Sequence, residues 1–216
     1  MSARYARSLP ALSAALVLIV GGLIGWQVTL GFQAFTWESY RRLQVEQEPQ
    51  SLPDVTLQTH RGEPWQLSDS AGRLQLVNFI YTRCATVCRT SGSLYARLVE
   101  AIEQRGWEDR IQLISISLQP EYDTPARLRA FRQRYRQHDN GLWLTARARN
   151  RHDHRRLLDA CGVVSIPDPW GGIQHNDALH LVDASGSLVR ILDTDIERLL
   201  KQLETRFGKH ATRAFH

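Results

Sequence analysis

The sequence predicts an α/β domain of three layers with a mixed sheet, preceded by one N-terminal transmembrane helix. Three observations carry this prediction. A long apolar run lies near the start, strand-like and helix-like segments alternate through the rest, and two cysteines stand where the first buried strand meets a helix. At 216 residues the chain has room for one domain of ordinary size and an accessory segment.

The apolar run covers residues 11–34 and contains no charged side chain. About 20 apolar residues span a bilayer, so this run is long enough to cross one. Arg4 and Arg7 lie on its short N-terminal side, which favours a cytoplasmic location for residues 1–10. We therefore expect a single-pass protein of the inner (cytoplasmic) membrane.

A cleavable signal peptide is the alternative interpretation of this run. Its apolar core would be shorter and would end in a small-x-small site, which residues 32–34 match poorly. With either interpretation the rest of the chain is exported to the periplasmic side. There we expect a polar stalk at residues 35–53, a globular domain at residues 54–208 and a tail at residues 209–216.

The charge balance argues against nucleic-acid binding. The formal charge is 27 − 22 = +5, and it falls to 25 − 22 = +3 without Arg4 and Arg7. This small excess is spread along the chain without a Lys/Arg block, whereas nucleic-acid-binding surfaces cluster their cations.

Strand and helix patterns alternate from residue 55 onward. The segments expected as strands are residues 55–59, 64–67, 74–81, 111–118, 142–144, 178–182 and 188–192. The segments with helical periodicity are residues 87–105, a helix capped by Thr124, residues 151–160 and a last helix that starts near Asp195. Interleaved strands and helices that end in a hairpin and a helix are typical of a three-layer α/β domain.

Cys84 and Cys88 follow the buried strand at residues 74–81. Residues four apart on a helix share one face, so both thiols should point the same way. The positive end of the helix, with Arg83 and Arg89 beside it, favours thiolate over thiol. Thiolate is both a redox nucleophile and a soft metal ligand. Such a pair at the first strand-to-helix junction gives the thioredoxin arrangement.

His175 is the candidate third ligand. It lies in a glycine-rich loop before the strand at residues 178–182. In a thioredoxin-like fold that loop abuts the N-terminus of the first helix. An imidazole nitrogen with two thiolates makes a three-coordinate site suited to Cu(I), or to Cu(II) with one further ligand, although zinc also accepts these ligand types.

Other candidate residues have simpler explanations. We expect Cys161 to be a small buried hydrophobe at a helix end and His180 to be a packed strand residue. His152 and His154 are expected at a solvated helix end. Met1 is the only methionine, which excludes the axial methionine of blue-copper sites.

Three segments, in this order, resemble the Sco/SenC family. They are residues 78–88 with both cysteines, residues 114–125, and His175 followed by residues 181–186. The similarity extends over about residues 54–207 and includes the N-terminal anchor. Members of this family are membrane-anchored, thioredoxin-like copper proteins that assist assembly of the dinuclear copper centre of cytochrome c oxidase.

The resemblance implies that Cys84, Cys88 and His175 bind copper, and that the chain is a metallochaperone. The implied partner is a copper-accepting cytochrome c oxidase subunit or another copper chaperone. Several positions depart from the family pattern, and such changes tune metal affinity or redox potential. Ala85 and Arg89 replace prolines, Gln119 replaces an acid, and His180 replaces an aromatic residue, whereas Asp123 is retained.

Two other functions remain open on the residues alone. A thiol–disulfide oxidoreductase would use Cys84 and Cys88 to keep cysteines of the oxidase or of another exported protein reduced. Thioredoxin-type enzymes normally have Cys-x-x-Cys and a facing cis-proline, so that match is partial. A peroxidase or a redox sensor is the weaker alternative. Asp123, before Thr124 and Pro125, is sufficiently explained as part of a helix start.

Overall fold

The computed structural model describes residues 5–29, 36–70, 72–83, 87–136, 138–167 and 172–211, with the backbone alone for residues 5–12, 87–90 and 208–211. The chain divides into two compact units, Met1–Glu48 and Pro49–His216. The second unit contains the sheet. It begins at Pro49, slightly before Asp54, the residue at which the sequence predicts the start of the domain.

The first unit contains two helices, α1 (Tyr5–Val28) and α2 (Trp37–Gln47). The expected anchor, residues 11–34, falls partly outside the described residues. Within the described part of the chain, no helix combines the length and the apolar character of a bilayer span. The stalk that the sequence indicates is largely helical, because Thr36 and Ser39 form a reciprocal capping box at the start of α2.

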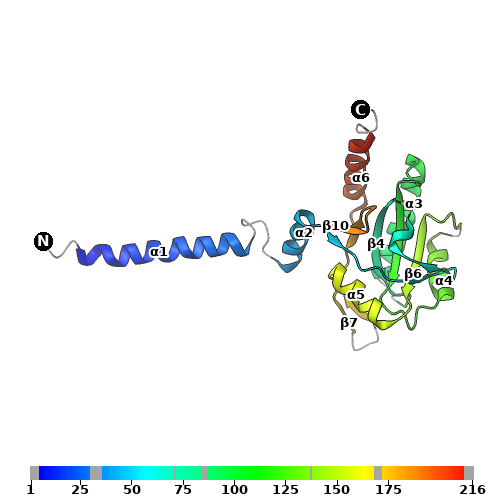
Figure 1. Ribbon diagram of the computed structural model, residues 1–216, viewed down its shortest axis with the longest axis horizontal. Coiled ribbons are helices and arrows are strands. Elements are labelled where there is room, and N and C mark those ends of the chain that lie inside the picture. The colour runs from blue at the N-terminus through cyan, green and yellow to red at the C-terminus, as the bar shows by residue number, and fades with distance from the viewer. Residues whose placement is uncertain are drawn as a thin grey trace. The chain divides into compact units, whose positions relative to one another are not determined.

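The second unit is built on a mixed sheet, as the sequence predicts, and this sheet has eight strands (Figure 1). The strand order is β1-β10-β9-β4-β5-β6-β2-β3. A separate two-stranded sheet pairs β7 with β8. The strands are β1 (Gln50–Ser51), β2 (Leu57–Thr59), β3 (Pro64–Trp65), β4 (Leu74–Ile80), β5 (Ile111–Ser117), β6 (Trp143–Ala148), β7 (Ser165–Pro167), β8 (Ile173–His175), β9 (Leu179–Val182) and β10 (Ser187–Leu192).

The centre of the sheet is parallel and its flanks are antiparallel. β4 pairs with β5, and β5 with β6, in parallel. β9 pairs antiparallel with β4 on one side, and β2 pairs antiparallel with β6 on the other. Every residue of β5 and all but the first of β4 are buried, which explains why apolar residues occur on both faces of these strands.

Four helices cover the sheet: α3 (Val87–Arg105), α4 (Pro125–Tyr135), α5 (Arg151–Cys161) and α6 (Ile196–Ala211). α3 packs against α4, and an ion pair of 3.2 Å between Arg105 and Glu204 joins α3 to α6. α5 contacts β6 from the opposite side of the sheet (Figure 1). The result is the helix–sheet–helix layering expected from the sequence.

Three aromatic side chains form the core between α3, α4 and β6. The rings of Tyr95 and Phe131 lie 5.6 and 6.4 Å from that of Trp143, between centroids. Tyr95 donates a hydrogen bond of 3.0 Å to the carbonyl of Leu76. Trp143 Nε1 donates one of 3.0 Å to Ser115 Oγ. Because both polar tips are bonded, these large side chains are buried without an unsatisfied group.

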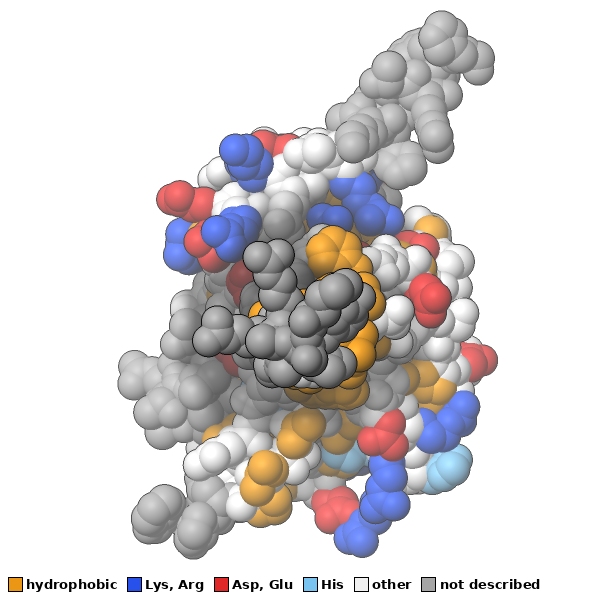
Figure 2. All heavy atoms as spheres, turned by 90° about the vertical axis from the view of Figure 1, so that its left-hand side faces the viewer, with side chains coloured by type: hydrophobic (Ala, Val, Ile, Leu, Met, Phe, Trp, Pro, Cys, Tyr) orange, Lys and Arg blue, Asp and Glu red, His pale blue; other side chains and the backbone are white. Residues whose placement is uncertain are grey.

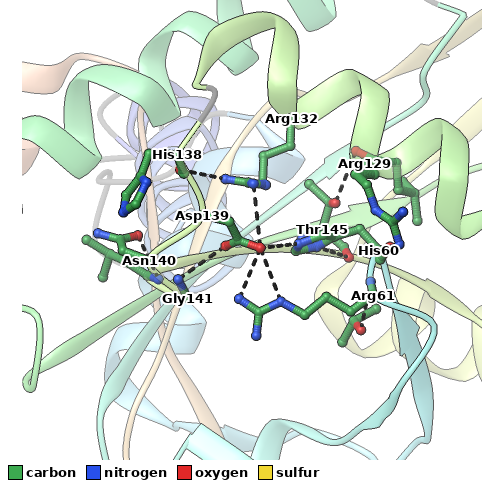
Figure 3. A network of polar contacts seen from close by, with 12 residues as sticks. His60, Arg61, Arg129, Arg132, His138, Asp139, Asn140, Gly141 and Thr145 are labelled. Atoms are coloured by element: carbon green, nitrogen blue, oxygen red, sulfur yellow. Dashed lines mark hydrogen bonds and ion pairs between the residues drawn. The ribbon is translucent and has the colours of Figure 1, made fainter.

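A partly buried polar network joins the turn after β2 to the segment before β6 (Figure 3). His60 Nε2 and Arg61 Nη2 each lie 3.0 Å from Asp139 Oδ2. Arg132 Nη2 lies 3.5 Å from the same oxygen, and its side chain is 3% exposed. The amide of Gly141 donates to Asp139 Oδ1 at 3.2 Å. One carboxylate therefore serves as the counter-charge for two guanidinium groups.

Candidate metal centre

The two cysteines lie at the limit of the described structure. Cys84 lies outside the described residues, and Cys88 belongs to the first turn of α3, for which the backbone alone is described. Among the side chains that are described, no three His, Cys, Asp or Glu residues are arranged to hold a metal ion. The residues on either side of this segment show how the chain enters it.

Asp123 holds the chain just after β4 ends, through bonds to Thr82, which lies two residues before Cys84. Its carboxylate is fully buried and accepts a hydrogen bond of 2.6 Å from Thr82 Oγ1. The backbone amide of Thr82 donates to the same carboxylate at 3.3 Å. Ser117 Oγ donates to it at 2.6 Å from the end of β5. Asp123 therefore ties the segment before the cysteines to the neighbouring strand.

The explanation of Asp123 as part of a helix start is incomplete. Thr124 is the residue that caps α4, since its side chain accepts from the amide of Arg127 at 3.4 Å. Asp123 instead bonds to Thr82 and Ser117, distant in sequence. The retained acid in the family resemblance was the available signal, but its bonding partners could not be read from the sequence.

Arg83, the residue directly before Cys84, is also fixed in place. Its guanidinium donates two hydrogen bonds, of 3.0 and 3.2 Å, to Gln119 Oε1. The same group lies 4.1 Å from the centre of the Tyr122 ring. These contacts bind Arg83 to the loop after β5, as Asp123 binds Thr82.

His175 is the last residue of β8, where the sequence predicts a loop. It pairs with Ser165 of β7 in the two-stranded sheet. The next residue, Asn176, accepts from the amide of Val164 at 2.9 Å and donates to the carbonyl of Gly162 at 3.1 Å. Strand pairing and these side-chain bonds give His175 a fixed backbone.

The His175 ring presents one nitrogen without a partner. Its Nδ1 lies 3.3 Å from the carbonyl of Asn176. Because a carbonyl can only accept, we assign the proton to Nδ1. Nε2 is buried and has no hydrogen-bond partner among the described residues. In the neutral ring this nitrogen carries a lone pair, the state in which imidazole binds a metal.

His175 lies beside the strand end that leads to the cysteines. Its ring packs edge-on against that of Tyr81, with 6.3 Å between centroids. Tyr81 directly follows β4 and precedes Cys84 by three residues. The structure thus brings His175 close to the start of the cysteine segment, although about 90 residues of chain separate them.

The sequence predictions for Cys161, His180 and His152 are confirmed, and the prediction for His154 needs correction. Cys161 is fully buried at the end of α5. His180 is fully buried on β9, and its Nε2 lies 3.0 Å from the carbonyl of Cys161. His154, expected at a solvated helix end, is half-buried, and burial lowers its pKa. His152, by contrast, is exposed, as expected.

Comparison with known proteins assigns this chain to a family. The SCO1 protein homolog of Bacillus subtilis is 27% identical over 149 residues, which cover 68% of this chain and 74% of that protein. A SCO1/SenC family lipoprotein from Bacillus anthracis superposes with a TM-score of 0.66 at 20% identity, covering 73% of this chain and 96% of that one.

Two further solved structures share the fold. BsSco, a member of the Sco family of cytochrome c oxidase assembly proteins in which a disulfide switch was identified, has a TM-score of 0.62 at 19% identity and covers 73% of this chain and 94% of its own. Copper-bound ScoI of Bradyrhizobium japonicum has a TM-score of 0.57 at 21% identity and covers 67% of this chain and 90% of its own. The thioredoxin-like fold expected from the sequence is confirmed. The SCO1/SenC family model matches residues 44–207, so the chain belongs to the SCO1/SenC family.

Proposed function

We propose that this protein is a membrane-anchored copper-binding protein that delivers copper to, or helps to mature, the copper centre of cytochrome c oxidase. Membership of the SCO1/SenC family supports this function. So does the similarity to copper-bound ScoI of Bradyrhizobium japonicum and to BsSco, a protein of a cytochrome c oxidase assembly family.

The observation that carries the proposal is the environment of His175. Its Nε2 is buried without a hydrogen-bond partner among the described residues, while Nδ1 is held by a backbone carbonyl. A buried acceptor without a donor is unfavourable unless something binds it. A metal ion held at this nitrogen together with Cys84 and Cys88 would satisfy it.

The three ligands are suited to a copper ion that must later be released to another protein. Two thiolates and one imidazole are soft or borderline donors that bind Cu(I) strongly. Three ligands leave one side of the ion open. An incoming thiolate of the acceptor can attack there, so that copper passes from one protein to the other by ligand exchange. The acceptor would be a cytochrome c oxidase subunit or another copper chaperone.

Residues 11–34 would anchor the chain in the inner membrane, with the second unit on the periplasmic side. The described apolar side chains of α1 are exposed, among them Leu18 at 76% and Val17 at 69%. A bilayer would cover such a surface. Extraction of membranes at alkaline pH tests this proposal, since the full chain should stay in the pellet. A variant without residues 1–34 should appear in the supernatant, and release of the full chain would contradict the anchor.

Competition for Cu(I) under anaerobic conditions tests copper binding. We expect the reduced full chain to bind one Cu(I) ion against a calibrated chelator. His175→Ala should weaken binding by about tenfold to a hundredfold, because one of three ligands is lost. His152→Ala is the matched control, since His152 is exposed on α5. Equal affinities of the wild type and His175→Ala would contradict the proposal.

A thiol–disulfide oxidoreductase is the second candidate, favoured by the Cys84 and Cys88 spacing at a helix start. The same variants separate the two functions. Turnover of a disulfide substrate that survives His175→Ala but is lost in Cys84→Ser would support thiol reduction over copper transfer.

A further inference from the structure

A cleft of about 770 Å³ is lined by residues that are close in sequence to both halves of the candidate copper site. Its wall includes Arg83, which directly precedes Cys84, and Ile173, two residues before His175. A ligand in this cleft would therefore lie next to both halves of the site. Its remaining walls come from the loop after β5, from α5 and from β7.

The loop after β5 is surrounded by arginines. Arg83 bonds to the side chain of Gln119, Arg127 to the carbonyl of Tyr122 at 2.7 Å, and Arg147 to the carbonyl of Pro120 at 2.8 Å. The Tyr122 ring also lies 3.7 Å from the Arg127 guanidinium. These bonds use uncharged acceptors, so the positive charges of these three guanidinium groups are not neutralised by them.

Few carboxylates balance this positive charge. Arg151 of α5 pairs with Glu121 of the loop, and the loop also contains the buried carboxylate of Asp123. Arg155 is exposed on α5 and lines the cleft opposite, with Asp159 as the other acid of the wall. The cleft and its surroundings therefore have an excess of positive charge, which favours a ligand that carries carboxylates.

The segment that forms one wall of the cleft also exposes apolar side chains. Val164 and Ile166 are each 58% exposed and, among the described residues of the second unit, they are its exposed large hydrophobic side chains. They alternate along the chain with Val163, Ser165 and Pro167, which line the cleft, so they lie on the opposite face of β7. Toward the bottom of Figure 2, hydrophobic side chains lie next to His, Arg and acidic side chains. Apolar groups exposed beside a charged cleft are typical of protein-binding surfaces.

We propose that this cleft binds an acidic segment of the copper-exchanging partner protein, a proposal that rests on the proposed function. Carboxylates of the segment would bind the arginines, while another part of the partner would cover Val164 and Ile166 on the opposite face of β7. Docking there would hold the ligands of the partner next to Cys84 and His175. It would also select partners by charge before copper moves.

Binding of a labelled peptide to the full chain in neutral detergent micelles tests this docking surface. The probe is a short peptide of Glu, Asp, Leu and Phe without Cys, His or Met, so that its binding does not require copper. A matched peptide carries Gln in place of each acid. Fluorescence anisotropy should show about tenfold tighter binding of the acidic peptide at low salt, and added salt should weaken it.

Two variants locate the binding. Arg155→Glu should weaken binding of the acidic peptide by about tenfold. Arg198→Glu, a charge reversal on α6 outside the cleft, should not change it. Equal binding of the two peptides, no binding of either, or an equal loss in Arg198→Glu would overturn the proposal.

Copper titrations separate this proposal from the function on which it rests. Arg155→Glu should bind Cu(I) as tightly as the wild type, because Arg155 is not among the expected ligands. An unchanged copper affinity with weakened peptide binding supports the docking surface. An unchanged Cu(I) affinity in His175→Ala would instead contradict the proposed copper function, whether or not the peptide binds.

Discussion

Asp139→Ala is expected to lower the free energy of unfolding by about 3–5 kcal/mol. Arg132 is 2% exposed and would lose its carboxylate partner, while His60 would lose the acceptor of its Nε2. A buried guanidinium without a counter-charge is among the most destabilising single changes. Chemical denaturation of the full chain followed by circular dichroism measures the effect.

Glu204→Ala is the matched control. Glu204 forms an ion pair of 3.2 Å with Arg105, but its side chain is 50% exposed. Its removal should change stability by less than about 1 kcal/mol, since exposed ion pairs contribute little. If Asp139→Ala were no more destabilising than Glu204→Ala, the network of Figure 3 would not stabilise the fold.

The loss of folding stability at acid pH gives a second measurement of the contribution of Asp139. Burial alone would raise its pKa, but hydrogen bonds from His60, Arg61 and Gly141 and the charge of Arg132 outweigh burial and lower the pKa from 3.8 to about 2. A pKa lowered in the folded state stabilises the protein above the unfolded pKa. This contribution should be lost as the pH falls from about 4 to about 2, and Asp139→Asn should show no such loss.

Asp123→Ala is expected to lower stability by about 2–4 kcal/mol, because it leaves the hydroxyls of Thr82 and Ser117 and one amide without their buried acceptor. It should also weaken Cu(I) binding, because Thr82 precedes Cys84 by two residues and would lose its anchor. Denaturation and Cu(I) competition on the same variant measure both effects.

Thr124→Ala controls for the start of α4. Thr124 is the N-cap, so its removal should cost about 1 kcal/mol and should leave copper affinity unchanged. Asp123→Asn keeps the size of the side chain but removes the charge, and it should weaken copper binding less than alanine does. If Thr124→Ala and Asp123→Ala behaved alike, Asp123 would act only through the helix.

Local patterns predicted most of the fold. The apolar stripe of α6 has a helical period because Leu199, Leu203 and Phe207 face the interior. β4 and β5 are rich in apolar residues on both faces because both faces are buried. The cysteine pair stood out because its chemistry and its place after β4 do not depend on distant residues.

Contacts between distant segments could not be predicted in the same way. No local pattern pairs His60 with Asp139, since they meet across 79 positions of sequence. β8, which carries His175, was expected as a loop because its three residues have no alternating pattern and depend on pairing with β7. Likewise, no pattern in the sequence showed that Asp123 bonds to Thr82.

X-ray absorption of the Cu(I)-loaded full chain tests the central claim most directly. The account predicts two sulfur ligands and one nitrogen ligand per copper in the wild type. It predicts the loss of the nitrogen in His175→Ala and of one sulfur in Cys88→Ser. A copper environment that is the same in His175→Ala and in the wild type would contradict the convergence of Cys84, Cys88 and His175 on one ion.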